Sequence, residues 1–324
     1  MGVNGSVLAI DAGNSKTDVA LIGKDGTVLS TARGGGFQPP VVGTDTAVDV
    51  LGAAVDQALA AAGTDAGSVA HVSACLANAD LPVEEAQLGE ALRARGWGRT
   101  VEVRNDTFAI LRAGADEPRG VAVVCGAGIN CVGMVPDGRT ARFPAIGRIS
   151  GDWGGGSGLS EEAMWFAARA EDGRGEPTEL ARTLPAHFGL ASMYALIEAL
   201  HLGRIAPERR HELSPVLFTT AAAGDAVARG LVDRLAEEVV ALSSVALSRL
   251  GLLDEEAPVL LGGSVLAARH PQLDGRIAEL LAVRAPKAVV RVVQESPVLG
   301  AGLLGLDHTG AAPEVHARLR AQYV

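Results

Sequence analysis

Residues 11–17 carry side chains that could bind a phosphate group and a metal ion. The segment reads Asp-Ala-Gly-Asn-Ser-Lys-Thr. A glycine lets backbone N–H groups approach a phosphate closely, whereas the carboxylate of Asp11 would bind a magnesium ion, directly or through water. An ordinary hairpin with a polar turn explains this segment alone equally well, so both interpretations stay open. The candidate phosphate ligands are Gly13, Asn14, Ser15, Lys16 and Thr17.

The elements that would position this segment occur twice in the chain. Apolar runs at 8–10 and 19–22 flank the polar loop, and a Lys-Asp-Gly turn signal at 24–26 precedes a third run. This order predicts two hairpins in series. Roughly a hundred residues later, an apolar run at 121–124, a Gly-Ala-Gly loop at 126–128, a second apolar run and a Pro-Asp-Gly turn repeat the pattern. We therefore expect a duplicated half-structure with one glycine loop per half, both facing a shared ligand.

Strands and helices alternate in the chain between these two copies. Thr44 is expected to cap a helix that runs to residue 62, and 69–75 reads as a buried strand. A helix begins at Pro82 and a short strand covers 101–104, whereas residues 176–257, beyond the second copy, read as mostly helical with a long helix from about 225 to 250. This alternation predicts a mixed α/β sheet with ligand groups at the ends of strands.

Composition excludes several classes of protein. The net charge of −10 and the aromatic content of 3% argue against a nucleic-acid partner, which would require a basic face. No apolar run reaches 18 residues and the N-terminus resembles no signal peptide, so we expect a cytoplasmic protein without a membrane partner. Three cysteines without a C-x-x-C pair indicate buried, inert thiols. The seven histidines show no H-E-x-x-H spacing and are expected to be surface or core residues, not metal ligands.

The Asp-x-Gly-x-Ser-x-Thr segment, followed by a second glycine loop after a later strand, resembles the actin/sugar-kinase/Hsp70 ATPase superfamily. The details are similar to the N-acetylglucosamine kinase-like members of the BadF/BadG/BcrA/BcrD ATPase family. The resemblance implies an α/β fold of two ribonuclease H-like lobes with an interdomain cleft. Residues 1–117 and a C-terminal helix at about 310–324 would form one lobe, and 118–309 the other.

The same resemblance implies an ATP-dependent kinase that uses Mg²⁺ near Asp11. Its substrate would be an amino sugar, phosphorylated at the 6-hydroxyl of N-acetylglucosamine or glucosamine. Asp106 would take the proton from the attacking hydroxyl, although it could also cap the helix at 107–113, and both roles stay open. Expected sugar contacts are Gln38, Asn78, Asn105, Asp106, Asn130, Gly147 and Asp152. Expected nucleotide contacts beyond the first loop are Gly126, Ala127, Gly128, Ala222, Gly262, Gly263 and Ser264.

Three positions depart from the family pattern. Trp153 replaces the Glu of a Gly-Asp-Glu-Gly-Ser segment, and Ala-Ile-Gly at 145–147 stands where Gly-Trp-Gly is usual. The second loop lacks the two hydroxyl side chains of Gly-Thr-Gly-Ser, which leaves its backbone N–H groups to bind phosphate. These changes bear more on recognition of the N-acetyl group than on ATP.

Other functions are compatible with part of the pattern. An ATPase switch of the dehydratase-activator type would hold an iron–sulfur cluster through cysteines, and none of the three lies in a suitable segment. Type III pantothenate kinases share the opening motif, but their chains are shorter and lack the glycine segment around Asp152. An intact Asp106 and two glycine loops argue against a non-catalytic sugar sensor. The resemblance leaves a homodimer open.

Overall fold

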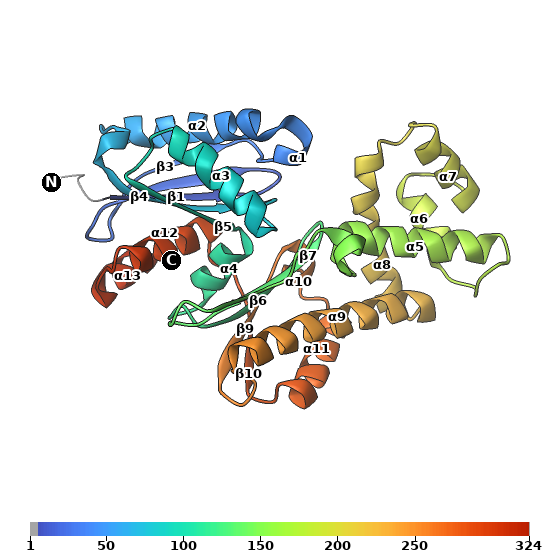
Figure 1. Ribbon diagram of the computed structural model, residues 1–324. Helices are drawn as coiled ribbons and strands as arrows, with labels where there is room; N and C mark the ends of the chain where they lie inside the picture. Colours follow the sequence, from blue (N-terminus) through green and yellow to red (C-terminus); the bar gives the residue numbers. More distant parts are fainter. Residues whose placement is uncertain (1–5, 324) are drawn as a thin grey trace. The chain divides into compact units, whose positions relative to one another are not determined.

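The chain is an α/β protein with two five-stranded sheets of the same strand order (Figure 1). The structure is a computed structural model that describes residues 6–323. The sheets run β3-β2-β1-β4-β5 and β8-β7-β6-β9-β10. The pair β2–β3 is antiparallel like β7–β8, and β4–β5 is parallel like β9–β10. The expected duplication is therefore confirmed at the level of topology. The strands are β1 Ser6–Ala12, β2 Thr17–Ile22, β3 Val28–Gly34, β4 Val69–Leu76, β5 Thr100–Asn105, β6 Gly120–Cys125, β7 Ile129–Met134, β8 Thr140–Arg142, β9 Ala257–Gly262 and β10 Ala288–Val292.

The described residues form two compact units. Unit 1 contains the chain through Ala122, Val132–Pro144 and the residues from Val293 onward, and unit 2 contains Val123–Cys131 and Ala145–Val292. These bounds differ from the lobes expected from the sequence. The main difference is helix α12 (Pro297–His308), which was expected in the second lobe and belongs to unit 1.

Glycines explain why α12 belongs to unit 1. A Cβ added at Gly300 would lie 1.8 Å from the carbonyl oxygen of Ala109 in α4 (Thr107–Gly114), and one at Gly305 would lie 2.4 Å from a methyl of Val7 in β1. Only glycine allows such close approach of backbone to neighbouring groups. Helices α4 and α12 lie on one face of the first sheet, and α2 (Thr44–Ala61) and α3 (Pro82–Ala94) lie on the other (Figure 1).

The C-terminal helix α13 (Pro313–Arg320) packs near the turn between β2 and β3. The side-chain oxygen of Gln322 accepts from the backbone N–H of Val28 at 2.9 Å, and Arg318 pairs with Asp25 at 3.1 Å. These contacts hold the helix against the N-terminal part of the chain.

One local expectation is wrong. Thr44 was expected to cap α2, but it is the first residue of the helix, and the cap position is Gly43 with a φ of 83° and no side-chain capping bond. The same helix buries an apolar face that includes Val48, Leu51 and Val55.

Unit 2 is mainly helical outside its sheet, as expected for 176–257. The long helix α9 (Ala226–Leu250) begins at Asp225, whose side chain accepts from the Ala228 N–H, and ends at Gly251 in the left-handed region. No helix among residues 6–323 is long and apolar enough to cross a membrane. The remaining helices are α1 Pro39–Val42, α5 Gly155–Glu171, α6 Leu180–His187, α7 Met193–His201, α8 Leu213–Ala222, α10 Ser264–Ala267 and α11 Pro271–Arg284, with 3₁₀ turns at Ala66–Ser68, Gly147–Ser150 and Pro207–Glu212.

Candidate active site

Three carboxylates lie at one edge of the first sheet. Asp11 is near the end of β1, Asp80 follows β4, and Asp106 follows β5. Because β1, β4 and β5 are parallel neighbours, their carboxyl ends meet at the same edge. The backbone N–H of Asp106 donates to the Leu76 carbonyl at 3.2 Å, which ties the end of β5 to the end of β4. Asp80 was not among the residues predicted from the sequence.

Burial and mutual repulsion disfavour the charged forms of these acids. Burial, followed by the charge of Asp106, raises the pKa of Asp11 to about 8 and that of Asp80 to about 7. Burial raises the pKa of Asp106 to about 6. Among the described residues, no side chain donates a hydrogen bond to Asp11, which is 8% exposed. An oxygen-rich cluster of this kind fits the donor preference of Mg²⁺, whose positive charge would favour the ionised carboxylates.

Replacing Asp11 by Asn should stabilise the protein in metal-free buffer near pH 8. Folding raises the pKa of the Asp11 carboxyl from its ordinary value, 3.8, to about 8. The free energy of unfolding therefore falls as the pH rises from about 3.8 to about 8. Since one pKa unit corresponds to about 1.4 kcal/mol, we expect Asp11→Asn to gain at least about 1 kcal/mol at pH 8 and almost nothing near pH 4. Urea unfolding with EDTA at both pH values measures this difference. The matched variant Asp56→Asn, on the exposed face of α2, should show no such dependence; equal behaviour of the two would contradict the prediction.

The first glycine loop is a four-residue connection between β1 and β2, as expected. Two of its predicted phosphate donors are used within the protein. The backbone N–H of Gly13 donates to the Lys16 carbonyl at 2.9 Å, and the buried hydroxyl of Thr17 donates to the Gly35 carbonyl at 2.8 Å. The Lys16 ammonium pairs with Asp18 at 2.7 Å. Phosphate binding by this loop stays a prediction.

Asn14, Gln38 and Asn78 are brought together at the tip of the loop. The Asn78 side chain donates to the side-chain oxygen of Asn14 at 3.0 Å and to the Phe37 carbonyl at 3.2 Å. The Gln38 amide donates to the Asn14 carbonyl at 2.7 Å. Asn78 has a φ of 61°, a left-handed conformation that Asn tolerates better than most residues. The two predicted sugar ligands therefore also position the loop.

Asn105, not Asp106, serves the start of α4. The side-chain oxygen of Asn105 accepts from the Thr107 N–H at 2.9 Å, and its amide donates to Asp80 at 2.8 Å. The Asp106 side chain makes no capping hydrogen bond. Of the two roles left open for Asp106, helix capping is therefore not observed, and the role of proton acceptor stays a prediction.

The second glycine loop lies between β6 and β7 in unit 2. Its carbonyls accept from the start of α5, with Gly156 N–H donating to Gly126 at 2.7 Å and Ser157 N–H to Ala127 at 3.0 Å. A Cβ added at Gly126 or Gly128 would have no atom within 4 Å. The packing of the chain therefore gives no reason for these two glycines, and the space beside them is open to a ligand.

Replacing Gly128 by Ala should impair nucleotide binding without affecting stability. The added methyl group meets no protein atom but occupies the open space beside the loop. We expect a stability change within about 0.5 kcal/mol and at least a tenfold increase in KM for ATP, corresponding to about 1.4 kcal/mol. Urea unfolding and initial rates at varied ATP measure the two effects. The comparison variant is Gly263→Ala, which should destabilise because its Cβ would lie 2.5 Å from the Cys125 backbone. An unchanged KM in Gly128→Ala would contradict the assignment of the loop.

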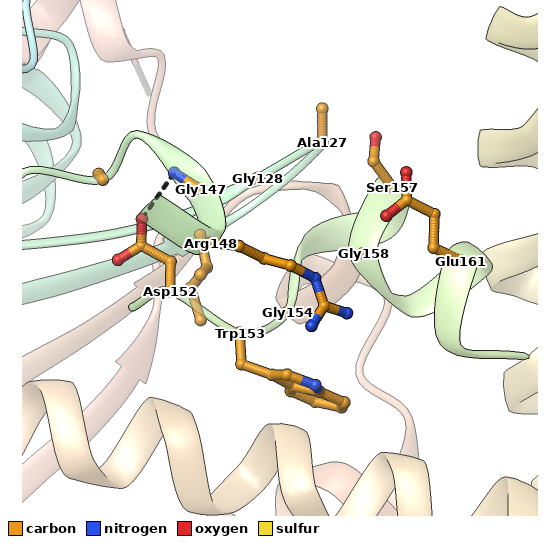
Figure 2. Close-up of a pocket in the computed structure, with 12 residues that line it drawn as sticks. Ala127, Gly128, Gly147, Arg148, Asp152, Trp153, Gly154, Ser157, Gly158 and Glu161 are labelled. Atoms are coloured by element: carbon orange, nitrogen blue, oxygen red, sulfur yellow. Dashed lines mark hydrogen bonds between the residues drawn. The ribbon is translucent and has the colours of Figure 1, made fainter. Parts of the chain in front are cut away.

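Two cavities meet at this loop. The Asp152 cavity, about 210 Å³, is lined by Gly128, Gly147 and Asp152 among others (Figure 2). The Phe218 cavity, about 390 Å³, is mainly apolar, and the rings of Phe218 and His270 at its wall are stacked 3.8 Å apart. Ala127 lines both cavities. The other residues that line the Phe218 cavity include Gly126, Gly156, Ser214, Ser264 and Val265.

Asp152 is held firmly in its cavity. One carboxylate oxygen accepts from the Gly147 N–H at 2.9 Å (Figure 2). The same oxygen accepts from the Ser150 hydroxyl at 2.6 Å. The neighbouring Trp153 is 7% exposed, and the Arg234 guanidinium lies over its ring at 4.3 Å. Trp153 therefore forms a rigid wall of the cavity, stabilised by a cation–π contact.

Some predicted contacts are not among the residues that line the two cavities. Ala222 is exposed at the end of α8, and Gly262 and Gly263 lie at the end of β9. Gly263 has a φ of 82° and packs against the Cys125 backbone, which explains why a glycine is needed at this position. The side-chain oxygen of Asn130 accepts from the Cys131 N–H at 2.7 Å. Nucleotide or sugar contacts from these four residues stay predictions.

The three cysteines are buried, as expected. Burial raises the pKa of the Cys125 thiol to about 12 and that of the other two above their ordinary value. Buried, protonated thiols are poor ligands for an iron–sulfur cluster, which counts against the activator type of ATPase.

The duplicated sheet order, with a loop between the first two strands of each sheet, defines the two-lobed, actin-like fold of the sugar kinases. A structure from Chromobacterium violaceum, named as an N-acetylglucosamine kinase, is 23% identical with a TM-score of 0.69, covering 94% of this chain and 99% of that one. A ROK family glucokinase from Streptomyces griseus, solved with glucose and AMPPNP, is 19% identical with a TM-score of 0.55, covering 94% of this chain and 99% of that one.

The sequence comparisons identify the family. The model of the BadF/BadG/BcrA/BcrD ATPase family matches residues 8–305, and the chain belongs to this family. An N-acetylmuramic acid/N-acetylglucosamine kinase of Clostridium acetobutylicum is 24% identical over 301 residues, which cover 92% of this chain and 97% of the relative. The family resemblance seen in the sequence is thus confirmed.

Proposed function

We propose that this chain is an ATP-dependent kinase that phosphorylates an amino sugar, N-acetylglucosamine or glucosamine, at the 6-hydroxyl. The observation that carries the proposal is the position of the second glycine loop, with Ala127 lining both the Phe218 cavity and the Asp152 cavity. An apolar pocket with a stacked aromatic pair suits a nucleobase. A phosphate chain starting in that pocket would cross the loop toward Asp152.

The names of the relatives support this choice of substrate. The Clostridium protein is named for N-acetylmuramic acid and N-acetylglucosamine, and the Chromobacterium structure for N-acetylglucosamine. In the Asp152 cavity, only one oxygen of the Asp152 carboxylate accepts a hydrogen bond from the described residues. The other oxygen is left to accept from a sugar hydroxyl.

The proposed reaction assigns a proton acceptor to the first sheet. Asp106 takes the proton of the sugar hydroxyl while the hydroxyl oxygen forms a bond to the γ-phosphorus. The bond between the γ-phosphorus and the oxygen that bridges it to the β-phosphate breaks, and ADP leaves. Asp11 would hold Mg²⁺, which neutralises charge on the phosphates when bound. Most of the catalysis in phosphoryl transfer comes from positioning and electrostatics, so the rigid setting of Asp106 between β5 and α4 matters as much as its basicity.

A coupled assay of ADP release tests the proposal. The panel consists of N-acetylglucosamine, glucosamine, N-acetylmuramic acid and glucose, with 6-deoxy-N-acetylglucosamine as the matched control that lacks the reacting hydroxyl. We expect sugar-dependent ADP release with an amino sugar and none with the 6-deoxy control. ADP release that does not depend on any sugar would contradict the proposal and favour an ATPase switch. A cytoplasmic location remains a prediction from the sequence, and a homodimer remains open.

A further inference from the structure

We propose that His71, Glu102 and His308 form a binding site for a transition-metal ion, with Zn²⁺ as the best fit. The three residues come from β4, β5 and the last residue of α12, all in unit 1. One potential ligand atom from each lies within 4.8 Å of the other two. None of them is among the groups assigned to ATP, Mg²⁺ or sugar, so this site is separate from the proposed function.

The hydrogen bonds around His71 fix which ring nitrogen is available. Its Nδ1 lies 2.9 Å from the Thr100 hydroxyl oxygen, and that hydroxyl donates its single proton to the Ala70 carbonyl at 3.2 Å. The hydroxyl oxygen must therefore accept from Nδ1–H. In the neutral imidazole, this bond places the lone pair on Nε2. A backbone-anchored partner on the second nitrogen is how proteins orient histidines that bind metals.

The Nε2 atom of His71 has no hydrogen-bond partner among residues 6–323, although the side chain is 1% exposed. A buried polar atom without a partner destabilises the folded state, and native proteins carry few of them. The Nε–H of Arg104 in the same cluster is also buried without a partner, but it is a donor and cannot bind a cation. The unpaired lone pair of His71 is therefore the observation that points to a missing ligand.

Glu102 offers one carboxylate oxygen to the same place. Its Oε1 accepts from the Arg104 guanidinium at 2.8 Å, which orients the group. Its Oε2 lies 3.6 Å from His308 Nδ1, too far for a hydrogen bond. The positive charge of Arg104 is therefore directed at the other oxygen, Oε1.

His308 must turn for the site to close. Its ring is stacked on that of His71, 3.9 Å apart and within 10° of parallel, so the in-plane lone pairs cannot converge on one ion. The His308 side chain is 44% exposed at the end of α12, which leaves it free to rotate. Two imidazoles and one carboxylate match a zinc site with an open position. A cavity of about 230 Å³ is lined by Glu102 and His308, among other residues, and leaves room for a water molecule beside these two side chains.

The experiment uses the full chain, stripped of metal with EDTA and dialysed. We expect one equivalent of Zn²⁺ to bind in calorimetry, Co²⁺ to give visible absorption bands of a protein-bound ion, and Zn²⁺ to raise the melting temperature in a saturable way. His308→Ala and Glu102→Gln should each weaken binding more than about tenfold and abolish the shift in melting temperature. His71 is left unchanged because it is buried.

The matched control is His201→Ala, since His201 is also an exposed histidine at the last position of a helix, α7. It should bind both metals like the wild type. Absence of saturable binding, or equal binding by His308→Ala and His201→Ala, would overturn the proposal. Because the readouts are binding, absorption and melting, they are independent of kinase activity and of the proposed function.

Discussion

Asp106→Asn is expected to reduce kcat by about 10²–10⁴, the usual contribution of a general base, while sugar binding is preserved. Asparagine keeps the size and hydrogen-bonding shape of the side chain but cannot accept the proton of the sugar hydroxyl. The coupled ADP assay measures kcat, and calorimetry with N-acetylglucosamine measures binding. Near-normal turnover in this variant would show that the assigned proton acceptor is wrong.

Two further measurements separate catalysis from general damage. Asp137→Asn, at an exposed turn where Asp137 pairs with Arg139, should leave kcat unchanged. The pH dependence of kcat/KM is an independent test of the role of Asp106. Since burial raises the pKa of Asp106 to about 6 and only the deprotonated form accepts a proton, kcat/KM should fall about tenfold per pH unit below about pH 6. A profile that stays flat down to pH 4.5 would contradict the role of Asp106.

Gly300→Ala is expected to cause a large loss of stability, because Gly300 has the closest backbone contact of the glycines in residues 6–323. The added Cβ would lie 1.8 Å from the Ala109 carbonyl oxygen and 2.9 Å from the Ala113 nitrogen. Because both groups are backbone atoms of α4, no side chain can turn away, and the two helices must separate. Such overpacking costs about 1–3 kcal/mol and sometimes more, and we expect the upper end, measured by urea unfolding.

Gly275→Ala is the matched control, since it makes the same change in the exposed middle of α11 with no atom within 4 Å. It should stabilise by about 0.5–1 kcal/mol, because glycine is less favourable than alanine within a helix. If both variants changed stability by the same amount, the close contact between α12 and α4 would not exist in solution.

The elements that the sequence predicted well are those set by local patterns. The hairpins of β1–β3 follow from apolar runs separated by turn residues, and α9 follows from its periodic core face between Asp225 and Gly251. The cap of α2 was predicted wrongly because the sequence does not distinguish a threonine at the N-cap from a threonine at the first position of the helix. In the structure Gly43 adopts a left-handed conformation there, and no side chain is needed.

The parts of the site that the sequence could not show depend on distant residues. Phe218 and His270 stack across 52 positions of the chain, and neither lies in a recognisable motif. His71 and His308 meet because glycines allow α12 to pack closely on the first sheet. No local sequence pattern indicates this contact, so the sequence predicted the histidines to be ordinary surface or core residues. Asp80 is different, because its position two residues after Asn78 at a strand end was a usable signal.

The crowding of Asp11, Asp80 and Asp106 also has an evolutionary consequence. Each acid makes the empty protein less stable near neutral pH, because burial opposes its charge, and Asp11 and Asp80 are also repelled by Asp106. A gene copy released from selection for phosphoryl transfer would gain stability by losing any one of them. In descendants of this chain, substitution of these acids should therefore come early, and an intact trio would mark a lineage that still turns over its substrate.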